Sequence, residues 1–386
     1  MRFCPSIFAS LLKPLDRRSF QAIVDRHAGD AYDKSFDSWD HLVALIFAQF
    51  SQARSLRGLV ADWNASAHHH YHLGTDTLAR STFADANGRR PVPVFAETFA
   101  MLSQLVDRPT RRDGAQMLRL IDSTPVPLGV LCDCATWNGR IRGLKMHVVY
   151  DPTADHPRLI EITPANVNDV SVGRDTPLEA DTTYVFDKGY CHYGWWTKIH
   201  DAGATFVTRP KLNARLRSRM KRPLKRTRGD GFRVVEDCEV SLVSKGDSKL
   251  PIPLRRIKIV RDNGQKITLL TNDMNRSAVE IGALYKARWQ IELLFRWIKQ
   301  NLDIRNFLGR NQNAIHLQII AAMIAFLLLR LAARLHRISL PAIRFAELVA
   351  ACLFVRKPLH QIHRPPPVNP SSRQPADPNQ LLFNYA

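Results

Sequence analysis

The segment at residues 285–299, Tyr-Lys-Ala-Arg-Trp-Gln-Ile-Glu-Leu-Leu-Phe-Arg-Trp-Ile-Lys, places the strongest constraint on the fold. It lacks Pro and Gly and is rich in helix-forming residues, which predicts a helix. At about 100° per residue, four polar side chains share an arc of roughly 60°: Tyr285, Arg288, Glu292 and Lys299. An apolar stripe lies about a quarter turn away: Leu284, Ala287, Ile291, Leu294, Phe295, Ile298 and Leu302. We expect the stripe to pack on a core and the polar edge to face a cleft.

Two aspartates upstream complement the carboxylate of Glu292. Asp122 follows the apolar run 117–121, and Asp187 follows the run 184–186. On the helix alone, a carboxylate three or four residues from a cation is also the pattern of an ordinary surface salt bridge. Three acids, two at strands and one on a helix, form a set of hard oxygen ligands that suits Mg²⁺ over a phosphate.

Composition narrows the class of partner. The chain has 386 residues, enough for two or three domains, and 45% hydrophobic residues, as in a globular protein. Its net charge of +20 favours a polyanion, DNA or RNA before a membrane. The six cysteines are scattered and lack the paired spacing of a zinc site, which indicates free thiols in a reducing cytosol.

Residues 1 to about 108 show helical periodicity throughout. Within them, 75–87 predicts a short helix after a turn, carrying Arg80 and Ser-Thr; a recognition helix in the major groove and an ordinary packing helix are both open. The histidine-rich run 68–72 is a metal site if helical, or else a polar turn or a phosphate contact.

From Gln116 the pattern changes to short β-like runs separated by turn residues. The predicted strands are 117–121, 146–150, 159–163, 183–186 and 205–208, with a short helix at 168–174. Further on, 319–329 is an unbroken run of eleven apolar residues, too short to span a bilayer. It predicts a buried core helix.

The spacing between Asp187 and Glu292 predicts an insertion, because it far exceeds one strand and one loop. Residues 209–228 hold ten Lys or Arg and no acid, which indicates contact with a DNA backbone or, alternatively, a solvated loop. Four more runs read as strands: 232–235, 239–243, 254–260 and 266–270. A β-rich insertion is therefore expected at 210–272.

The spacing Y-x2-R-x3-E-x6-K, with Asp122 in Ile-Asp-Ser-Thr and Asp187 in Phe-Asp-Lys-Gly-Tyr, resembles the DDE transposases of bacterial insertion sequences. The match is to family four of those elements, named for its Tyr-Arg-Glu-Lys signature, and covers roughly 117–331. The resemblance implies an α/β fold: a ribonuclease-H-like core, a mixed sheet flanked by helices, interrupted by a β-rich insertion and preceded by an all-helical domain. The expected parts are a helical DNA-binding domain (1–108), the first part of the core (109–209), a β-rich basic insertion (210–272), the second part of the core with C-terminal helices (273–362) and a disordered Pro-rich tail (363–386).

The resemblance also implies the chemistry. Asp122, Asp187 and Glu292 are expected to ligate two Mg²⁺ ions, with Mn²⁺ as a substitute. The resemblance places Tyr285, Arg288 and Lys299 on DNA near the transposon end. The residues themselves add further expected DNA contacts: Lys188 beside Asp187, Arg80 of the predicted short helix, and Arg215, Arg217, Arg219, Lys221 and Arg222 of the basic run. The implied activity is cleavage at transposon ends and transfer of the 3′-hydroxyl end into target DNA. The implied partners are double-stranded DNA, as terminal inverted repeats and as target, and a second copy of the chain bound to the same DNA. The implied location is the cytoplasm, at the nucleoid, with no membrane involved.

One departure from the family lies in the last predicted strand of the insertion. Better-known members place a Trp after a Lys there to stack a flipped base, whereas here Ile267 follows Lys266. Trp289 or Trp297 are the candidates to replace it, and either also fits a core position. A metal-dependent nuclease without strand transfer and an inactive DNA-binding relative remain alternatives to a transposase.

Overall fold

The computed structural model describes residues 4–31, 33, 35–51, 53–107, 117–224, 227–242, 250–302 and 306–364. The predicted tail lies outside this range from 365 onward, and so does the predicted boundary at 108 and 109.

The described part of 4–107 is helical, as its periodicity predicts. Its elements are α1 (Ile7–Leu12), α2 (Arg17–Arg26), α3 (Ser38–Ser51), α4 (Leu56–Ala65), the 3₁₀ helix η1 (Ala67–Leu73), α5 (Arg80–Arg89) and α6 (Val92–Asp107). Four of the helices follow a side chain that accepts a hydrogen bond from the backbone N–H three residues on: Ser6, Asp16, Asp37 and Ser55. The predicted short helix at 75–87 begins later than expected, at Arg80, and ends at Arg89.

The histidine-rich run forms η1. His70 is buried, its ring stacks on Trp63 at 4.3 Å between centroids, and its Nε2 lies 3.1 Å from the Trp63 carbonyl oxygen. Within the part of the chain that the structure describes, the run belongs to no cluster able to hold a metal. Of the histidines in the run, His70 is used for packing.

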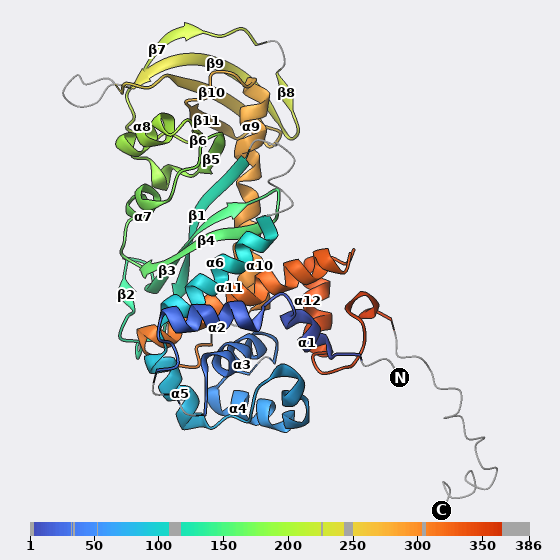
Figure 1. Ribbon diagram of the computed structural model, residues 1–386. Helices are drawn as coiled ribbons and strands as arrows, with labels where there is room; N and C mark the ends of the chain where they lie inside the picture. The colour runs from blue at the N-terminus through green and yellow to red at the C-terminus, as the bar shows by residue number, and fades with distance from the viewer. Residues whose placement is uncertain are drawn as a thin grey trace, which may run out of the picture.

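Helix α11 (Gln312–Leu335) is the central helix of the fold and packs against α3 and α6 (Figure 1). By length and composition alone it is apolar enough to cross a membrane, but 83% of its most apolar window is buried inside the protein. The prediction of a buried core helix at 319–329 is confirmed.

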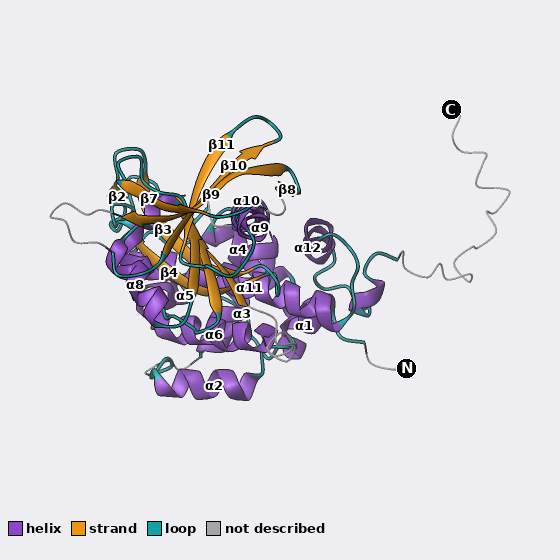
Figure 2. Ribbon diagram, turned by 90° about the horizontal axis from the view of Figure 1, so that it is seen from above, coloured by secondary structure: helices purple, strands orange, loops and turns teal. Residues whose placement is uncertain are grey.

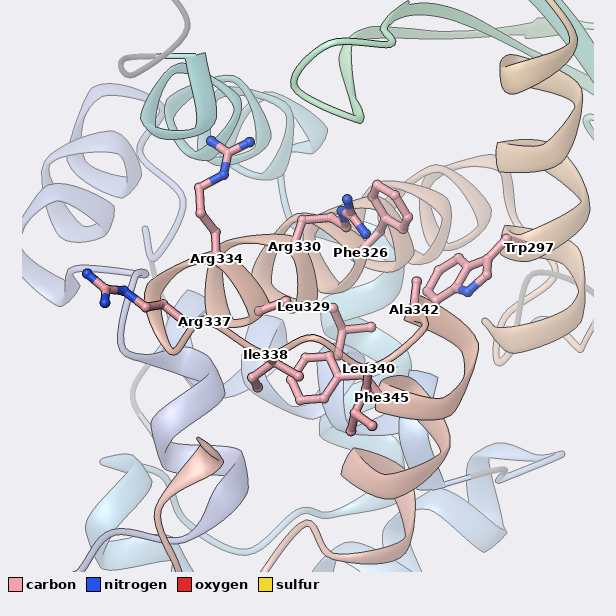
Figure 3. Close-up of a pocket in the computed structure, with 11 residues that line it drawn as sticks. Trp297, Phe326, Leu329, Arg330, Arg334, Arg337, Ile338, Leu340, Ala342 and Phe345 are labelled. Atoms are coloured by element: carbon pink, nitrogen blue, oxygen red, sulfur yellow. The ribbon is translucent and has the colours of Figure 1, made fainter. Parts of the chain in front are cut away.

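A groove of about 390 Å³ lies where α11 meets α10 (Trp289–Asn301) and α12 (Ala342–Ala351). Its apolar lining includes Trp297, Phe326 and Phe345, and the arginines of α11 extend away from it (Figure 3). Arg334 donates to the carbonyl oxygens of Val106 at 2.8 Å and Ala154 at 3.2 Å. This arginine therefore joins the end of α6 to a turn of the sheet.

The strands form one large mixed sheet. They are β1 (Met117–Pro127), β2 (Thr136–Trp137), β3 (Arg142–Asp151), β4 (His156–Pro164), β5 (Thr182–Phe186), β6 (Thr205–Thr208), β7 (Leu216–Lys221), β8 (Arg228–Gly229), β9 (Phe232–Leu242), β10 (Leu254–Arg261) and β11 (Lys266–Thr271). Among the described residues their order is β2-β3-β1-β5-β6-β11-β10-β9-β7, with β4 also paired to β3 and β8 to β9. β1 is antiparallel to β3 and parallel to β5, and β5 is parallel to β6.

The sheet differs from expectation in several places, and β2 was not predicted at all. β1 does not end before Asp122, because its ladder with β3 continues to Pro127. The runs 232–235 and 239–243 are one strand, β9. The basic run contains strands β7 and β8, which pair with β9. The strands expected in an insertion continue the main sheet, since β11 pairs with β6 (Figure 1).

Helices cover both faces of the sheet, because side chains alternate along each strand. On one face, Tyr184 and Phe186 of β5 join a core cluster with Trp195 of α8 (Tyr193–Asp201). On the other face, Val185 joins the core that contains Ile281 of α9 (Ala278–Ala287) and Ile291 of α10. Figure 2 shows α8 on one side of the strands and α9 and α10 on the other. The remaining elements are α7 (Asp169–Asp175), η3 (Lys188–Tyr190) and η4 (Leu359–Gln361).

A buried ion pair holds the far end of the sheet together. The Arg255 Nε and Nη2 atoms donate to the two carboxylate oxygens of Asp237 at 2.7 and 2.6 Å, and Nη1 donates to the Arg276 carbonyl oxygen at 2.6 Å. Both side chains are at most 4% exposed. The pair therefore links β9, β10 and the turn that leads into α9.

We expect Arg255→Met to lower the free energy of unfolding by about 3–5 kcal/mol, because it leaves the Asp237 charge buried without a partner. The double variant Arg255→Met/Asp237→Leu should recover most of that loss, since no charge is left buried. Urea unfolding of both proteins measures this, and a single variant as stable as the wild type would contradict it.

Candidate active site

Parallel pairing brings the two aspartates together. Ile121 of β1 is paired with Phe186 of β5, so the residues that follow them, Asp122 and Asp187, occupy equivalent positions on neighbouring strands. Ile121 and Phe186 belong to the core under α8. By alternation, both aspartates face α9 and α10.

The predicted single helix at 285–299 is wrong in one respect: the chain forms α9 and α10, which meet at Arg288. There the Arg288 N–H bonds to the Tyr285 carbonyl oxygen, and the Ile291 N–H bonds to that of Arg288, each at 3.2 Å. These are the i,i+3 bonds of a tighter turn, a local feature that apolar periodicity does not encode. The apolar stripe is confirmed where it matters most, since Ile291 and Ile298 are fully buried.

Arg288 connects the carboxylates of the site. Its Nη1 donates to Asp122 Oδ2 at 3.0 Å and its Nη2 donates to Glu292 Oε1 at 2.5 Å. The pair with Glu292 has the i,i+4 spacing of a surface salt bridge, but the side chains of Arg288 and Asp122 are only 17% and 20% exposed. The contact spans 166 positions of the chain. The i,i+4 salt bridge of Arg288 with Glu292 is therefore present, but it does not account for the contact of Arg288 with Asp122.

The other signature residues reach the same face. The Tyr285 hydroxyl donates to Asp187 Oδ1 at 3.4 Å. Lys299 Nζ donates to Thr124 Oγ1 at 2.6 Å, and Thr124 lies two residues after Asp122, on the same face of β1. All six residues named by the signature and its two aspartates thus converge on the junction of β1, β5, α9 and α10.

Burial governs the electrostatics of the site. It raises the pKa of Asp122 to about 6; Arg288 acts to lower that pKa, and the charges of Glu292 and Asp187 act to raise it. Burial opposes the charge on Arg288, yet its acidic neighbours, Asp122 first, raise the pKa of the guanidinium above its ordinary value. Burial also raises the pKa of Tyr285, which keeps its phenol as a hydrogen-bond donor.

Within the described residues, no three His, Cys, Asp or Glu side chains converge closely enough to hold a metal ion. The physical reason is that three carboxylates repel one another, and here the Arg288 guanidinium stands between two of them. The donors themselves, carboxylate oxygens on one face, have the hard character that Mg²⁺ and Mn²⁺ prefer. Metal binding by Asp122, Asp187 and Glu292 stays a prediction.

The structure separates the predicted DNA contacts into two groups. Lys188 and Arg80 are exposed, and so are four basic side chains on or next to β7: Arg215, Arg217, Arg219 and Lys221. Arg222 differs, because it donates to Glu239 Oε1 at 3.1 Å and to the Met274 carbonyl oxygen at 2.9 Å. Its guanidinium is used inside the protein, so grouping it with the exposed cations was wrong.

The two candidate tryptophans have different environments. Trp297 packs edge-on against Phe326, with 5.0 Å between ring centroids, and belongs to the core. Trp289 is 49% exposed, has Arg296 over its ring, and borders a cavity of about 690 Å³ beside Tyr285. Of the two, only Trp289 presents a ring to solvent.

The sequence did not single out the polar residues behind the site. Ser123 Oγ and Lys145 Nζ both donate to Asp169 Oδ1 at 2.9 Å. The available signals were local: Ser123 follows Asp122, and Asp169 opens the predicted helix at 168–174.

Comparison with known families then decides the class. The family described as "Transposase DDE domain" matches residues 113–328, more than half of the chain. The chain belongs to the DDE transposase family. The matched range contains every residue from Asp122 to Lys299 discussed above, whereas Arg80 lies outside it. A domain of unknown function, DUF4372, matches residues 4–76.

Relatives of this transposase carry the same class in their names. A putative transposase, y4zB of Sinorhizobium fredii, is 63% identical over 303 residues, which cover 78% of this chain and 85% of that protein. A probable transposase of insertion sequence element IS5377 from Geobacillus stearothermophilus is 31% identical over 246 residues, 62% of this chain and 63% of that one. A putative transposase of element IS4SA from Synechocystis is 27% identical over 270 residues, 67% and 73% of the two chains. This chain is therefore a transposase related to those of insertion sequences.

The buried histidine behind the site gives a pH prediction. Burial lowers the pKa of His147 from 6.5 to about 4, so between these values the unfolded chain binds a proton that the folded protein does not. The free energy of unfolding should fall as the pH is lowered from 6.5 to 4, and His147 should contribute on the order of 3 kcal/mol of that fall. Urea unfolding of His147→Gln should show a shallower pH dependence than the wild type. His68→Gln, at an exposed histidine, should leave it unchanged; equal slopes for all three proteins would refute the assignment.

Proposed function

We propose that this transposase cuts DNA at the ends of its insertion sequence and transfers the 3′-hydroxyl end into target DNA by a cut-and-paste reaction. The single observation that carries the proposal is the placement of Asp122 and Asp187 side by side on parallel strands, facing α9 and α10, where Arg288 bonds to both Asp122 and Glu292. Membership of the family supports it.

The topology supports a ribonuclease-H-like core. The order β4-β3-β1-β5-β6, with β1 antiparallel to β3 and parallel to β5, is the arrangement expected of that fold: three antiparallel strands and two further parallel ones. In this reading, β7 to β11 form the β-rich insertion, and the part boundaries at 108, 209 and 272 are proposals as well.

Asp122, Asp187 and Glu292 would hold the metal, two Mg²⁺ ions or Mn²⁺ in their place. When bound, such ions activate an oxygen nucleophile and neutralise charge on the leaving oxygen. The protein's own cations act on the phosphates: Arg288 through its planar fork and Lys299 as a point charge. Tyr285 supplies a further donor.

Arg288 changes partners in this proposal. In the protein alone it neutralises Asp122 and Glu292, and its buried Nε has no hydrogen-bond partner among the described residues. A DNA phosphate accepts the hydrogen bonds of the guanidinium in place of the two carboxylates. The carboxylate oxygens are then free to bind metal. The exchange keeps every buried charge paired.

The rest of the molecule offers surfaces for DNA. The net charge of +20 and the exposed cations at β7 favour its phosphates, Lys188 lies beside Asp187, and Arg80 opens the exposed start of α5. We assign α5 to recognition of the terminal repeat, which competition between end and random DNA would test. Joining two transposon ends requires two active sites, so the active unit on DNA is a homodimer, which light scattering of the protein–DNA complex tests. Its place is the nucleoid, in the cytoplasm.

Conservative changes to the three acids test the chemistry. Glu292→Gln, Asp122→Asn and Asp187→Asn should each reduce cleavage of a labelled terminal repeat in Mg²⁺ by orders of magnitude, because a metal supplies several kcal/mol of transition-state stabilisation. Double variants should be no worse than single ones, since the three act together. DNA affinity should stay near normal.

The control is Asp201→Asn, at an exposed acid ending α8. Near-normal cleavage by Glu292→Gln would overturn the site. If the wild-type protein cleaves DNA but does not join the ends to target DNA, it is a nuclease. If it binds DNA without cleaving it, it is an inactive relative of the transposases.

The basic strand gives a separate prediction about affinity. Replacing Arg215, Arg217, Arg219 and Lys221 together by Gln should flatten the slope of log K against log salt by roughly 3–4, because each phosphate contact releases close to one counterion. Loss should be equal on all sequences. Arg222→Gln is the matched control: it breaks internal hydrogen bonds but should leave the salt slope alone. An unchanged salt slope in the fourfold variant would show that these four side chains are solvated and do not contact DNA.

A further inference from the structure

A second polar cluster lies on the face of the sheet opposite the carboxylates. Because side chains alternate along β1, Asp122 faces α10 and Ser123 faces α7. Ser123 Oγ donates to Asp169 Oδ1 at 2.9 Å, across 46 positions of the chain. Asp169 is the first residue of α7, so this hydrogen bond joins α7 to the residue next to Asp122.

Lys145 fixes the orientation of that carboxylate. Its Nζ donates to Asp169 Oδ1 and to the Val167 carbonyl oxygen, each at 2.9 Å, and its side chain is 16% exposed. Lys145 lies on β3, the antiparallel neighbour of β1. It therefore holds both the start of α7 and the side chain of Asp169 against the strand that carries Asp122.

Asp169 also borders the segment after the second catalytic aspartate. A side-chain carbon added at Gly189 would lie 3.3 Å from Asp169 Oδ2, and one added at Gly173 of α7 would lie 2.9 Å from the Tyr190 ring. Asp187 immediately precedes this segment, η3. The Tyr190 hydroxyl lies 3.4 Å from Nδ1 of His147, whose strand position is opposite Ser123.

We propose that Asp169 is a positioning residue of the active site, which with Lys145 fixes from behind the separation of the backbone segments bearing Asp122 and Asp187. The inference rests on the proposed metal-dependent function. A fixed separation matters there because partners outside the coordination sphere orient metal-ligating carboxylates, and their loss typically costs about 10–100-fold in metal affinity or activity. Asp169 does not touch substrate in this assignment; it acts through Ser123 and the η3 segment.

A simpler role for Asp169 is as the acid in the first turn of α7, where it favours the helix dipole. If that were its only role, replacing Asp169 would lower the thermal stability of the protein and leave metal binding unchanged. It does not account for the hydrogen bond to Ser123 or for the contact with Gly189. The two roles differ in what they do to metal binding.

The test uses the full-length protein and Mn²⁺ as the probe, with binding measured by electron paramagnetic resonance and cleavage of a labelled terminal repeat measured separately. Asp169→Ala should weaken Mn²⁺ binding about 10–100-fold and lower kcat with KM for DNA unchanged. Raised Mn²⁺ should restore part of the rate. Asp169→Asn should recover part of the loss, because its amide oxygen still accepts from Ser123. Ser123→Ala should show the same defect, and the double variant should be no worse than Asp169→Ala.

Asp175→Ala is the matched control, an exposed acid at the other end of α7, and should behave as the wild type in every measurement. Wild-type Mn²⁺ affinity and kcat in Asp169→Ala, with only thermal stability reduced, would overturn the inference and leave the proposed function standing. A wild-type protein that neither binds Mn²⁺ nor cleaves would overturn both. Should Asp169→Ala fail to fold, Ser123→Ala decides by the same criteria, since it removes a single oxygen.

Discussion

The parallel pairing of β1 with β5 is the constraint on which the active site depends. It sets Asp122 beside Asp187, although 64 residues separate them along the chain. Parallel strands require a crossover connection, and here that connection carries β3, β4 and α7. The same connection supplies Lys145 and Asp169, so the segment that makes the pairing possible also braces it from behind.

The alternation of side chains along the strands then decides which face of the sheet each residue occupies. Side chains facing α8 make an aromatic core, while those facing α9 and α10 include the acidic groups of the site. Arg288 forms ion pairs with Asp122 and Glu292 where α9 and α10 meet. Charge is thus balanced in the protein alone.

Buried polar contacts join the helical part to the sheet. Asp107 at the end of α6 accepts from Arg158 at 3.1 Å and lies 3.2 Å from His156, both on β4. Arg334 of α11 reaches the backbone at Val106 and at Ala154. These contacts join α6 and α11 to the sheet at β4 and at the turn before it. Breaking any one of them leaves a buried charge or carbonyl without its partner.

The sequence by itself determined most of the elements and singled out the three acids as candidates. Apolar periodicity indicated the helical part before the sheet and located α11, and the β-like runs located β1 and β3 to β6, because periods of 3.6 and 2 are local properties. The spacing of Tyr285, Arg288, Glu292 and Lys299 identified the family. Only the tertiary structure decided that β1 continues past Asp122, that the chain turns at Arg288, and that Arg222 is used internally while its basic neighbours are exposed. It also revealed Asp169, whose partners Ser123 and Lys145 lie 46 and 24 positions away. Such contacts depend on strand pairing and packing between distant segments, and no local pattern in one sequence encodes them.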